Sequence, residues 1–193
     1  MKFSILTLLF FLSVIAANSQ DVDFSFSPKV KTQGYILTLE GDSIPKLISF
    51  LNDTKILTYD LDGNKKSKET FKASKLKGFK IGSYFFEAHK YKNIDIVNAS
   101  ATSLATPPKY FYMSQIISGK ISVLQHYYLD ADGKILSKFL LKKNGEKIRT
   151  RMKLKELVSD CTEVFVKIEN EKNLLISDEQ LISTVMDYNR TCK

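Results

Sequence analysis

The sequence predicts an α+β fold, in which an antiparallel β-meander sheet of about seven to nine strands is covered by a C-terminal pair of α-helices. Residues 147–155, KIRTRMKLK, alternate strictly between apolar and basic side chains, which is the period of a strand with one buried face. Directly afterwards, apolar residues recur every three or four positions, which indicates an amphipathic helix. The members of this stripe are Leu154, Leu157, Val158, Cys161, Phe165 and Ile168. Upstream, Asp132-Gly133 and Asn144-Gly145 are dipeptides typical of tight antiparallel hairpins.

The first 19 residues have the features of a cleavable secretory signal. Lys2 supplies a positive start, residues 3–17 are apolar, and small residues at 16–19 precede a polar stretch beginning at Gln20. The apolar run is short for a membrane span, and no other segment is apolar for long enough. We therefore expect cleavage after Ser19 and an exported product that is periplasmic, at the cell surface or secreted, without a transmembrane segment. The remaining residues, 20–193, have the length of one domain.

In the first half of that domain, short apolar runs alternate with turn residues. Strands are expected at 33–40, 47–50, 55–59 and 83–86. The segment 65–80 is rich in lysine, and Phe71, Leu76 and Phe79 are its expected inward anchors. Residues 92–108 are predicted to be an irregular connection, suited to the rim of a binding surface.

The second half has a stronger strand pattern and then a helical one. Strands are expected at 110–117, 121–129, 135–142 and 147–154, which extends the sheet over about residues 33–153. Helices follow at about 154–170 and 178–190. Ser177 and Gln180 fit a capping box at the start of the second helix. Its apolar face consists of Leu181, Val185, Tyr188 and Cys192.

The two cysteines, Cys161 and Cys192, form an even count in a chain that is expected to be exported. An oxidising compartment favours a disulfide between them, and closing a loop of this length stabilises a fold by roughly 3.5 kcal/mol in the chain-entropy model. The alternative is that Cys161 is a small core residue and Cys192 lies at a frayed end. Two cysteines and two distant histidines do not make a zinc site, so no metal or other cofactor is predicted.

No sequence motif of a known catalytic centre is present. The chain lacks a GxSxG elbow, an HExxH pair, a glycine-rich phosphate loop and a dinucleotide fingerprint. His126 shares a strand face with Leu124 and Tyr128, so a partly buried core histidine is the expected role. His89 is expected to be a solvated turn residue. An enzyme centred on His126 and a nearby acid is kept as an alternative.

The chain is basic, with a formal net charge of +8 at pH 7, and the predicted signal contains one lysine and no acid. A surplus of this sign favours anionic partners, although lysine on solvent faces also keeps β-rich proteins soluble. The sharpest basic feature is a predicted ridge along one strand, formed by Lys147, Arg149, Arg151 and Lys153. This ridge fits an anionic glycan, or it is simply the wet face of the strand. Nucleic acid is not expected as a partner, because no aromatic residue alternates with these cations.

Three segments carry a resemblance to a known group of proteins. Residues 31–44, KTQGYILTLEGDSI, look like the GYIxTxxGD opening of a group of uncharacterised exported proteins from Bacteroidota. Residues 110–128 are similar to that group's apolar run followed by GKIxLY, and LISTVMDYNRTC resembles its closing helix with Tyr-Asn. The chain departs from the group at Val123-Leu124-Gln125 and at Pro45. The resemblance implies export and an α+β fold, and it implies no activity.

These observations favour an exported, non-catalytic module of the cell envelope or a secreted binding module, with an anionic glycan or an envelope protein as its partner. One alternative is a carrier of a small apolar ligand, for which Tyr84-Phe85-Phe86 and Tyr110-Phe111-Tyr112 supply aromatic side chains. The other is a hydrolase with an unrecognised site.

Overall fold

A computed structural model describes residues 30–92, 107–129, 132, 135–170 and 176–192. The predicted signal, most of the connection at 92–108 and Gly133 of the predicted turn lie outside the described residues.

The described part of the chain forms a ten-stranded antiparallel sheet and a small group of helices, which agrees with the predicted α+β class. The strands are β1 (Thr32–Leu37), β2 (Ser43–Asn52), β3 (Lys55–Tyr59), β4 (Glu69–Lys72), β5 (Gly78–Ile81), β6 (Tyr84–Tyr91), β7 (Lys109–Ile117), β8 (Ile121–Leu129), β9 (Ile135–Lys143) and β10 (Arg149–Thr150). The short 3₁₀ helices are η1 (Lys65–Ser67), η2 (Ala73–Lys75) and η4 (Arg151–Lys153). The α-helices are α3 (Leu154–Val158), α4 (Thr162–Ile168) and α5 (Asp178–Thr191).

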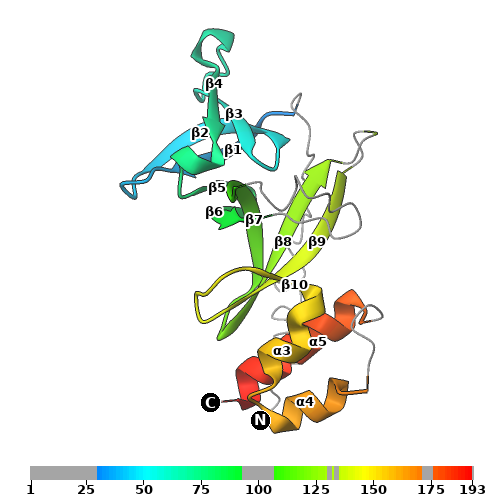
Figure 1. Cartoon of the computed structure of the whole chain (residues 1–193). Helices are drawn as coiled ribbons and strands as arrows, with labels where there is room; N and C mark the ends of the chain where they lie inside the picture. Colours follow the sequence, from blue (N-terminus) through cyan, green and yellow to red (C-terminus); the bar gives the residue numbers. More distant parts are fainter. Residues whose placement is uncertain (1–29, 93–106, 130–131, 133–134, 171–175, 193) are drawn as a thin grey trace, which may run out of the picture.

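The sheet has the strand order β10-β9-β8-β7-β6-β5-β1-β2-β3-β4. It therefore consists of two meanders, β1 to β4 and β5 to β10, which are joined side by side through β1 and β5. Four residue pairs make this join, from Gly34 opposite Ile81 to Leu37 opposite Gly78. In Figure 1 the first meander lies at one end of the molecule and the helices lie at the other end.

The strand count of ten exceeds the predicted seven to nine. The two strands without a predicted counterpart, β4 and β5, have four residues each; β4 lies within the lysine-rich segment 65–80 and β5 lies at its end. Their alternation is too short to stand out there, although Leu76 and Phe79 are buried as expected and Phe71 is partly buried. The prediction of a strand over 147–154 was wrong in length, because β10 has two residues and Arg151–Lys153 form a 3₁₀ turn.

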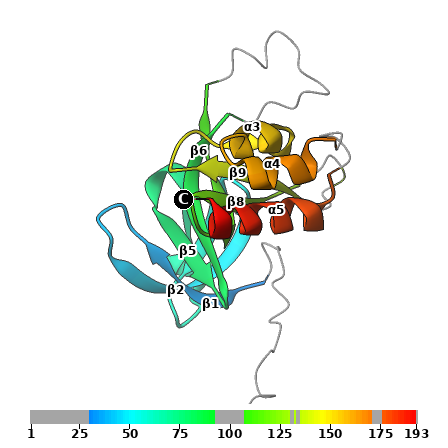
Figure 2. The same ribbon diagram turned by 90° about the horizontal axis from the view of Figure 1, so that it is seen from below.

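One apolar core lies between the helices and one face of β8 and β9. Figure 2 shows α3, α4 and α5 gathered on one side of these strands. The sheet contributes Ile121, Val123 and Leu141, all of which are fully buried. The helices contribute Leu154, Leu157, Val158, Val164, Ile168, Leu181, Val185 and Tyr188. Burial of these side chains is the main stabilising contribution of the helical layer, which covers the β8–β9 end of the sheet rather than the whole of it.

A second core, rich in aromatic residues, is enclosed by the strands of both meanders. Phe79 and Phe86 stack with ring centroids 4.8 Å apart, and Tyr112 meets Phe79 edge-on at 4.8 Å. The sheet curls around this cluster, because the turn between β2 and β3 reaches β7. There the Tyr112 N–H donates a hydrogen bond of 2.7 Å to the carbonyl oxygen of Asp53.

The predicted helix over 154–170 is broken into α3 and α4 at residues 159–161. Asp160 turns toward the sheet, where it accepts hydrogen bonds from Lys143 at 2.7 Å and from the Tyr188 hydroxyl at 3.0 Å. Cys161 has an extended backbone at the N-cap of α4 and forms the disulfide with Cys192. These tertiary contacts interrupt the helix while the apolar stripe continues across the break.

The last helix, α5, closely matches its prediction at 178–190 and is fastened at both ends. At its start, the Ser177 hydroxyl accepts a hydrogen bond from the Gln180 N–H. At its end, the Asn189 amide forms two hydrogen bonds with the backbone of Ile121, accepting from its N–H at 2.9 Å and donating to its carbonyl at 2.8 Å. Lys120 also donates to the Cys192 carbonyl at 3.0 Å. The start of β8 is thus bound to the end of the chain.

The buried hydroxyl of Tyr112 gives a first test of this packing. It has no hydrogen-bond partner among the described residues, and burial raises its pKa above the ordinary value. Because a buried hydroxyl without a partner contributes only its desolvation penalty, Tyr112→Phe is expected to leave the free energy of unfolding unchanged or to raise it by about 1 kcal/mol. Urea unfolding measures the change. The matched variant Tyr188→Phe, which loses its bonds to Asp160, should instead lose about 1 kcal/mol. If Tyr112→Phe lost as much stability as Tyr188→Phe, the Tyr112 hydroxyl would have to make a hydrogen bond in the folded protein.

Candidate functional site: a cationic pocket between β6 and β10

A pocket of about 480 Å³ lies between the end of β6 and the segment that forms β10. This volume falls within the usual range for sites that hold small organic molecules. Its described lining consists of Lys90, Tyr91, Lys92, Pro108, Lys147, Ile148, Arg149, Thr150 and Lys153. Five of these nine residues are cationic and none is acidic. We refer to this site as the cationic pocket.

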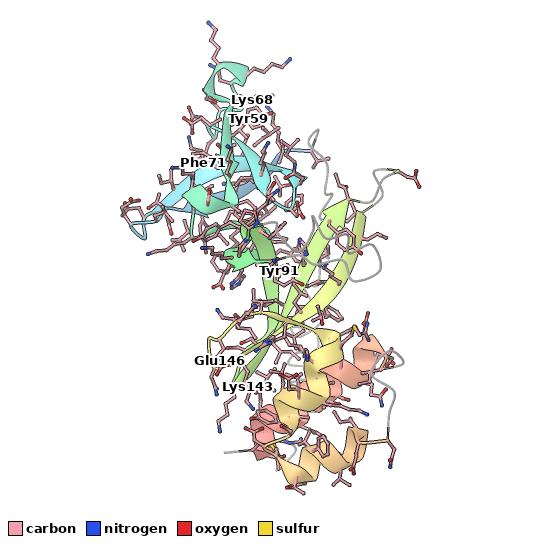
Figure 3. All side chains as sticks on the ribbon, viewed as in Figure 1. Tyr59, Lys68, Phe71, Tyr91, Lys143 and Glu146 are labelled. Carbon is pink, nitrogen blue, oxygen red and sulfur yellow. A yellow bond between two sulfur atoms is a disulfide. The ribbon has the colours of Figure 1, made fainter. Side chains whose placement is uncertain are left out.

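Two buried side chains determine where the cations lie. Tyr91 and Ile148 are each 6% exposed and belong to one apolar cluster with Phe111, Met113, Leu124 and Leu140. Their chain neighbours Lys90, Lys92, Lys147 and Arg149 therefore flank the buried positions and can direct their charged ends toward solvent. Figure 3 places Tyr91 near the middle of the molecule. Two segments distant in sequence thus bring their cations to one rim.

Three of the five cations in the described lining are not neutralised by any described residue. Lys90, Lys147 and Arg149 have no hydrogen bond or ion pair with any described residue. Lys153 pairs with Glu156 at 2.7 Å. That hydrogen bond, together with the charges of Lys153 and Arg149, holds the pKa of Glu156 below its usual range. The pocket therefore carries a local excess of positive charge that attracts anions.

The predicted ridge is only partly preserved in this arrangement. Lys147, Arg149 and Lys153 line the pocket, whereas Arg151 points toward the start of α5. Arg151 pairs with Asp178 at 2.8 Å and also donates to the carbonyl of Ile176. The four cations do not form a straight row, because β10 ends at Thr150 and the chain turns.

Of the cations in this pocket, Lys90 was missed by the sequence analysis, and Lys92 was included only as the first residue of the connection at 92–108, which was predicted to suit the rim of a binding surface. They flank Tyr91 in the same way that Lys147 and Arg149 flank Ile148. This shared pattern of a buried residue between two cations is visible in the sequence. Nothing local, however, indicates that the end of β6 lies beside the start of β10.

Lys143, which precedes the predicted ridge, has a structural role. Its ammonium group bonds to the carbonyl of Leu157 at 2.6 Å and to Asp160 at 2.7 Å, and it lies 5.0 Å from the centre of the Tyr188 ring. Burial lowers its pKa, but the hydrogen bonds with Asp160 and Tyr188 outweigh that effect and leave the pKa raised. The same contacts hold the pKa of Asp160 below its usual range, the bond from Lys143 being the largest cause. Lys143 therefore links β9 to the helices.

The two histidines occupy strand positions. His126 is fully buried in β8, and its Nε2 lies 3.1 Å from a carboxylate oxygen of Asp53. The sequence analysis considered an unspecified acid near His126, and in the structure that acid is Asp53. Among the described residues, Nδ1 of His126 has no hydrogen-bond partner. The pair joins the β2–β3 turn to β8.

The interpretation of His89 as a solvated turn residue was wrong. It lies in β6, its side chain is 11% exposed, and Nε2 is 3.2 Å from Glu87. The interaction with His89 is the largest cause of the lowered pKa of Glu87. His89 and Glu87 share one face of β6, two positions apart, so their contact is a local feature of the strand.

Within the described ranges, no group of three or more histidine, cysteine, aspartate or glutamate side chains is placed to hold a metal ion. Among the same residues, no helix combines the length and the apolar character that crossing a membrane requires. No protein-family model, no curated protein and no solved structure matches the chain.

Proposed function

We propose that the chain is an exported, non-catalytic binding module and that its cationic pocket holds an anionic ligand of the cell envelope. The observation that carries this proposal is the group of three cations, Lys90, Lys147 and Arg149, that have no partner among the described residues and line a pocket whose described lining contains no acidic residue. Unpaired cations beside a concave surface are available for charge-assisted hydrogen bonds to phosphate, sulfate or carboxylate groups. Arg149 adds a planar donor group suited to such anions.

The disulfide supports the proposed export to an oxidising compartment. The structure joins Cys161 and Cys192, whose Cα atoms are 5.8 Å apart. Disulfides persist in oxidising environments outside the cytosol. A bonded pair therefore fits the export that the N-terminal residues predict.

A carrier built around the central aromatic residues has less support. Phe86 and Tyr112, one from each aromatic group of the sequence, are fully buried and pack against Phe79. Their rings fill the core, and neither of them lines the cationic pocket.

Binding of a fluorescently labelled sulfated oligosaccharide tests the proposed function. We expect the double variant Lys147→Gln/Arg149→Gln to weaken binding about tenfold to hundredfold at moderate salt, since each of its two charge-assisted hydrogen bonds is about 1 kcal/mol stronger than the neutral bond that a glutamine amide can donate. The dependence of affinity on salt should also become less steep. Fluorescence anisotropy at several salt concentrations measures both effects.

The control variant is Lys65→Gln/Lys66→Gln, which removes the same charge from an exposed 3₁₀ turn in the first meander. Its affinity should stay within about twofold of the wild type, because a distant exposed charge is screened within about 10 Å at 0.1 M salt. Equal losses in the two double variants would show that net charge, and not the pocket, attracts the anion. Failure of the wild type to bind this probe or any other anion that is tested would contradict the proposal.

A further inference from the structure

The wall of the cationic pocket is mostly carbon, even though five of its nine described residues are charged. Tyr91, Pro108 and Ile148 supply an apolar part, and Thr150 adds a methyl group. Lysine and arginine side chains lay their aliphatic stems along such a surface and keep their charged ends at its edge. The pocket therefore combines an apolar interior with a cationic rim.

This combination distinguishes between kinds of anion. A free inorganic anion or a hydrophilic glycan would pair with the rim and leave the carbon wall in contact with water. A ligand that carries an apolar chain behind its anionic group would cover both parts. Burying the chain is favourable by the hydrophobic effect, in addition to the charge-assisted bonds at the rim.

We infer that the ligand of the cationic pocket is a single anionic amphiphile, with a phosphate or similar head group and an alkyl or acyl body. This inference rests on the proposed function and makes its ligand class specific. The head group lies between Lys90, Lys147 and Arg149, the three cations without described partners. The apolar body lies against Tyr91, Pro108 and Ile148.

A series of monoalkyl phosphates, from inorganic phosphate and ethyl phosphate to octyl phosphate, separates the two parts of the ligand. Calorimetric titration of the full exported chain is expected to show the affinity rising by about fourfold for each methylene that enters the pocket, until the pocket is full. Arg149→Gln should weaken every member of the series by a similar factor, because it affects the head group alone. Ile148→Thr should reduce the gain per methylene.

Ile148 is buried, so this variant needs a check of folding by circular dichroism. Pro108→Ser offers a second route, because Pro108 is exposed and lines the pocket without belonging to an apolar core. It should also reduce the gain per methylene. A gain that is unchanged in both folded variants would overturn the placement of the apolar body.

The remaining outcomes separate this inference from the proposed function. Equal affinity for inorganic phosphate and octyl phosphate would overturn the amphiphile and leave the anion-binding function standing. Tight binding of the sulfated oligosaccharide, with no gain from alkyl chains, would do the same and favour a glycan. Binding to phosphatidylglycerol vesicles without binding to monomeric octyl phosphate would indicate a membrane surface and overturn the pocket. Failure of every anion to bind would overturn both proposals.

Discussion

Replacing Cys161 and Cys192 together by alanine is expected to lower the free energy of unfolding by roughly 3.5 kcal/mol. The bond joins residues 31 positions apart, and the closed loop contains α4 and α5. Without the bond the unfolded chain gains the conformational freedom that the loop removes. The helical layer also loses the covalent link between the N-cap of α4 and the end of α5. Urea unfolding of the oxidised wild type and the double variant measures the difference.

Reduction of the wild type provides the control. A reducing agent should bring the wild type close to the stability of the double variant, and the double variant itself should not respond to reduction. The midpoint of unfolding is then expected to fall, and the dependence of the free energy on denaturant is expected to steepen, because the unfolded chain without the bond is less compact. A wild type that keeps its full stability under complete reduction would contradict the prediction.

The second large effect is expected at Asn189, where Asn189→Ala should cost about 2–4 kcal/mol. Its amide bonds to both backbone groups of Ile121, a residue that is itself fully buried. Removing the amide leaves a backbone donor and a backbone acceptor without partners, and each such group costs about 1–3 kcal/mol when it is buried. Asn189→Asp keeps the acceptor and loses the donor, so its loss should be intermediate. Thermal and urea unfolding measure all three proteins.

Gly119 and Arg190 complete the design of this experiment. A Cβ atom at Gly119 would overlap the Asn189 amide. Gly119→Ala should therefore also weaken the two hydrogen bonds between Asn189 and the Ile121 backbone. Arg190 neighbours Asn189 on α5, and its side chain is 78% exposed, with an ion pair to Asp187. Arg190→Ala should therefore cost no more than about 0.5 kcal/mol. If Asn189→Ala were as mild as Arg190→Ala, the two bonds to Ile121 would not hold α5 in place.

The elements that the sequence predicted well are those whose pattern is long and whose partners are local. The strand expected at 121–129 is β8, and the helix expected at 178–190 is α5 within one residue. Nine alternating residues and four turns of helix each give a clear period. The segment 65–80 shows the opposite case. Its strands, β4 and β5, have four residues each. Four residues are too few to show a clear alternation among so many lysines.

The errors near the C-terminus have a different cause, because tertiary contacts there override a strong local pattern. Arg151 continues the alternation of 147–155, but its ion pair with Asp178 accompanies a change to 3₁₀ structure. Asp160 lies within the helix predicted at 154–170, and its bonds to Lys143 and Tyr188 accompany the break between α3 and α4. Such contacts depend on residues that are distant in sequence.

The candidate site also contains residues that could be predicted from one segment and residues that could not. Lys147, Arg149 and Lys153 were predicted from their own segment and do line the pocket. That Lys90 and Lys92 join these cations was not predicted, because their position beside β10 follows from the order of strands across the sheet. Asp53 reaches His126 from the β2–β3 turn, 73 positions away in the sequence. A site assembled across a sheet cannot be read from one segment of the chain.

The two-meander topology has a consequence for the order in which the sheet assembles. Neighbouring strands within each meander follow one another in sequence, so their pairing closes shorter loops, the longest of which is the connection at 92–108. The β1–β5 pairing instead joins residues more than 40 positions apart. Closing such a loop costs more conformational entropy, and pairings of this kind slow folding. We therefore expect the hairpins of each meander to form early and the β1–β5 pairing to be the slow step. The described lining of the cationic pocket, from Lys90 to Lys153, belongs to the second meander and η4, so it can form before that step.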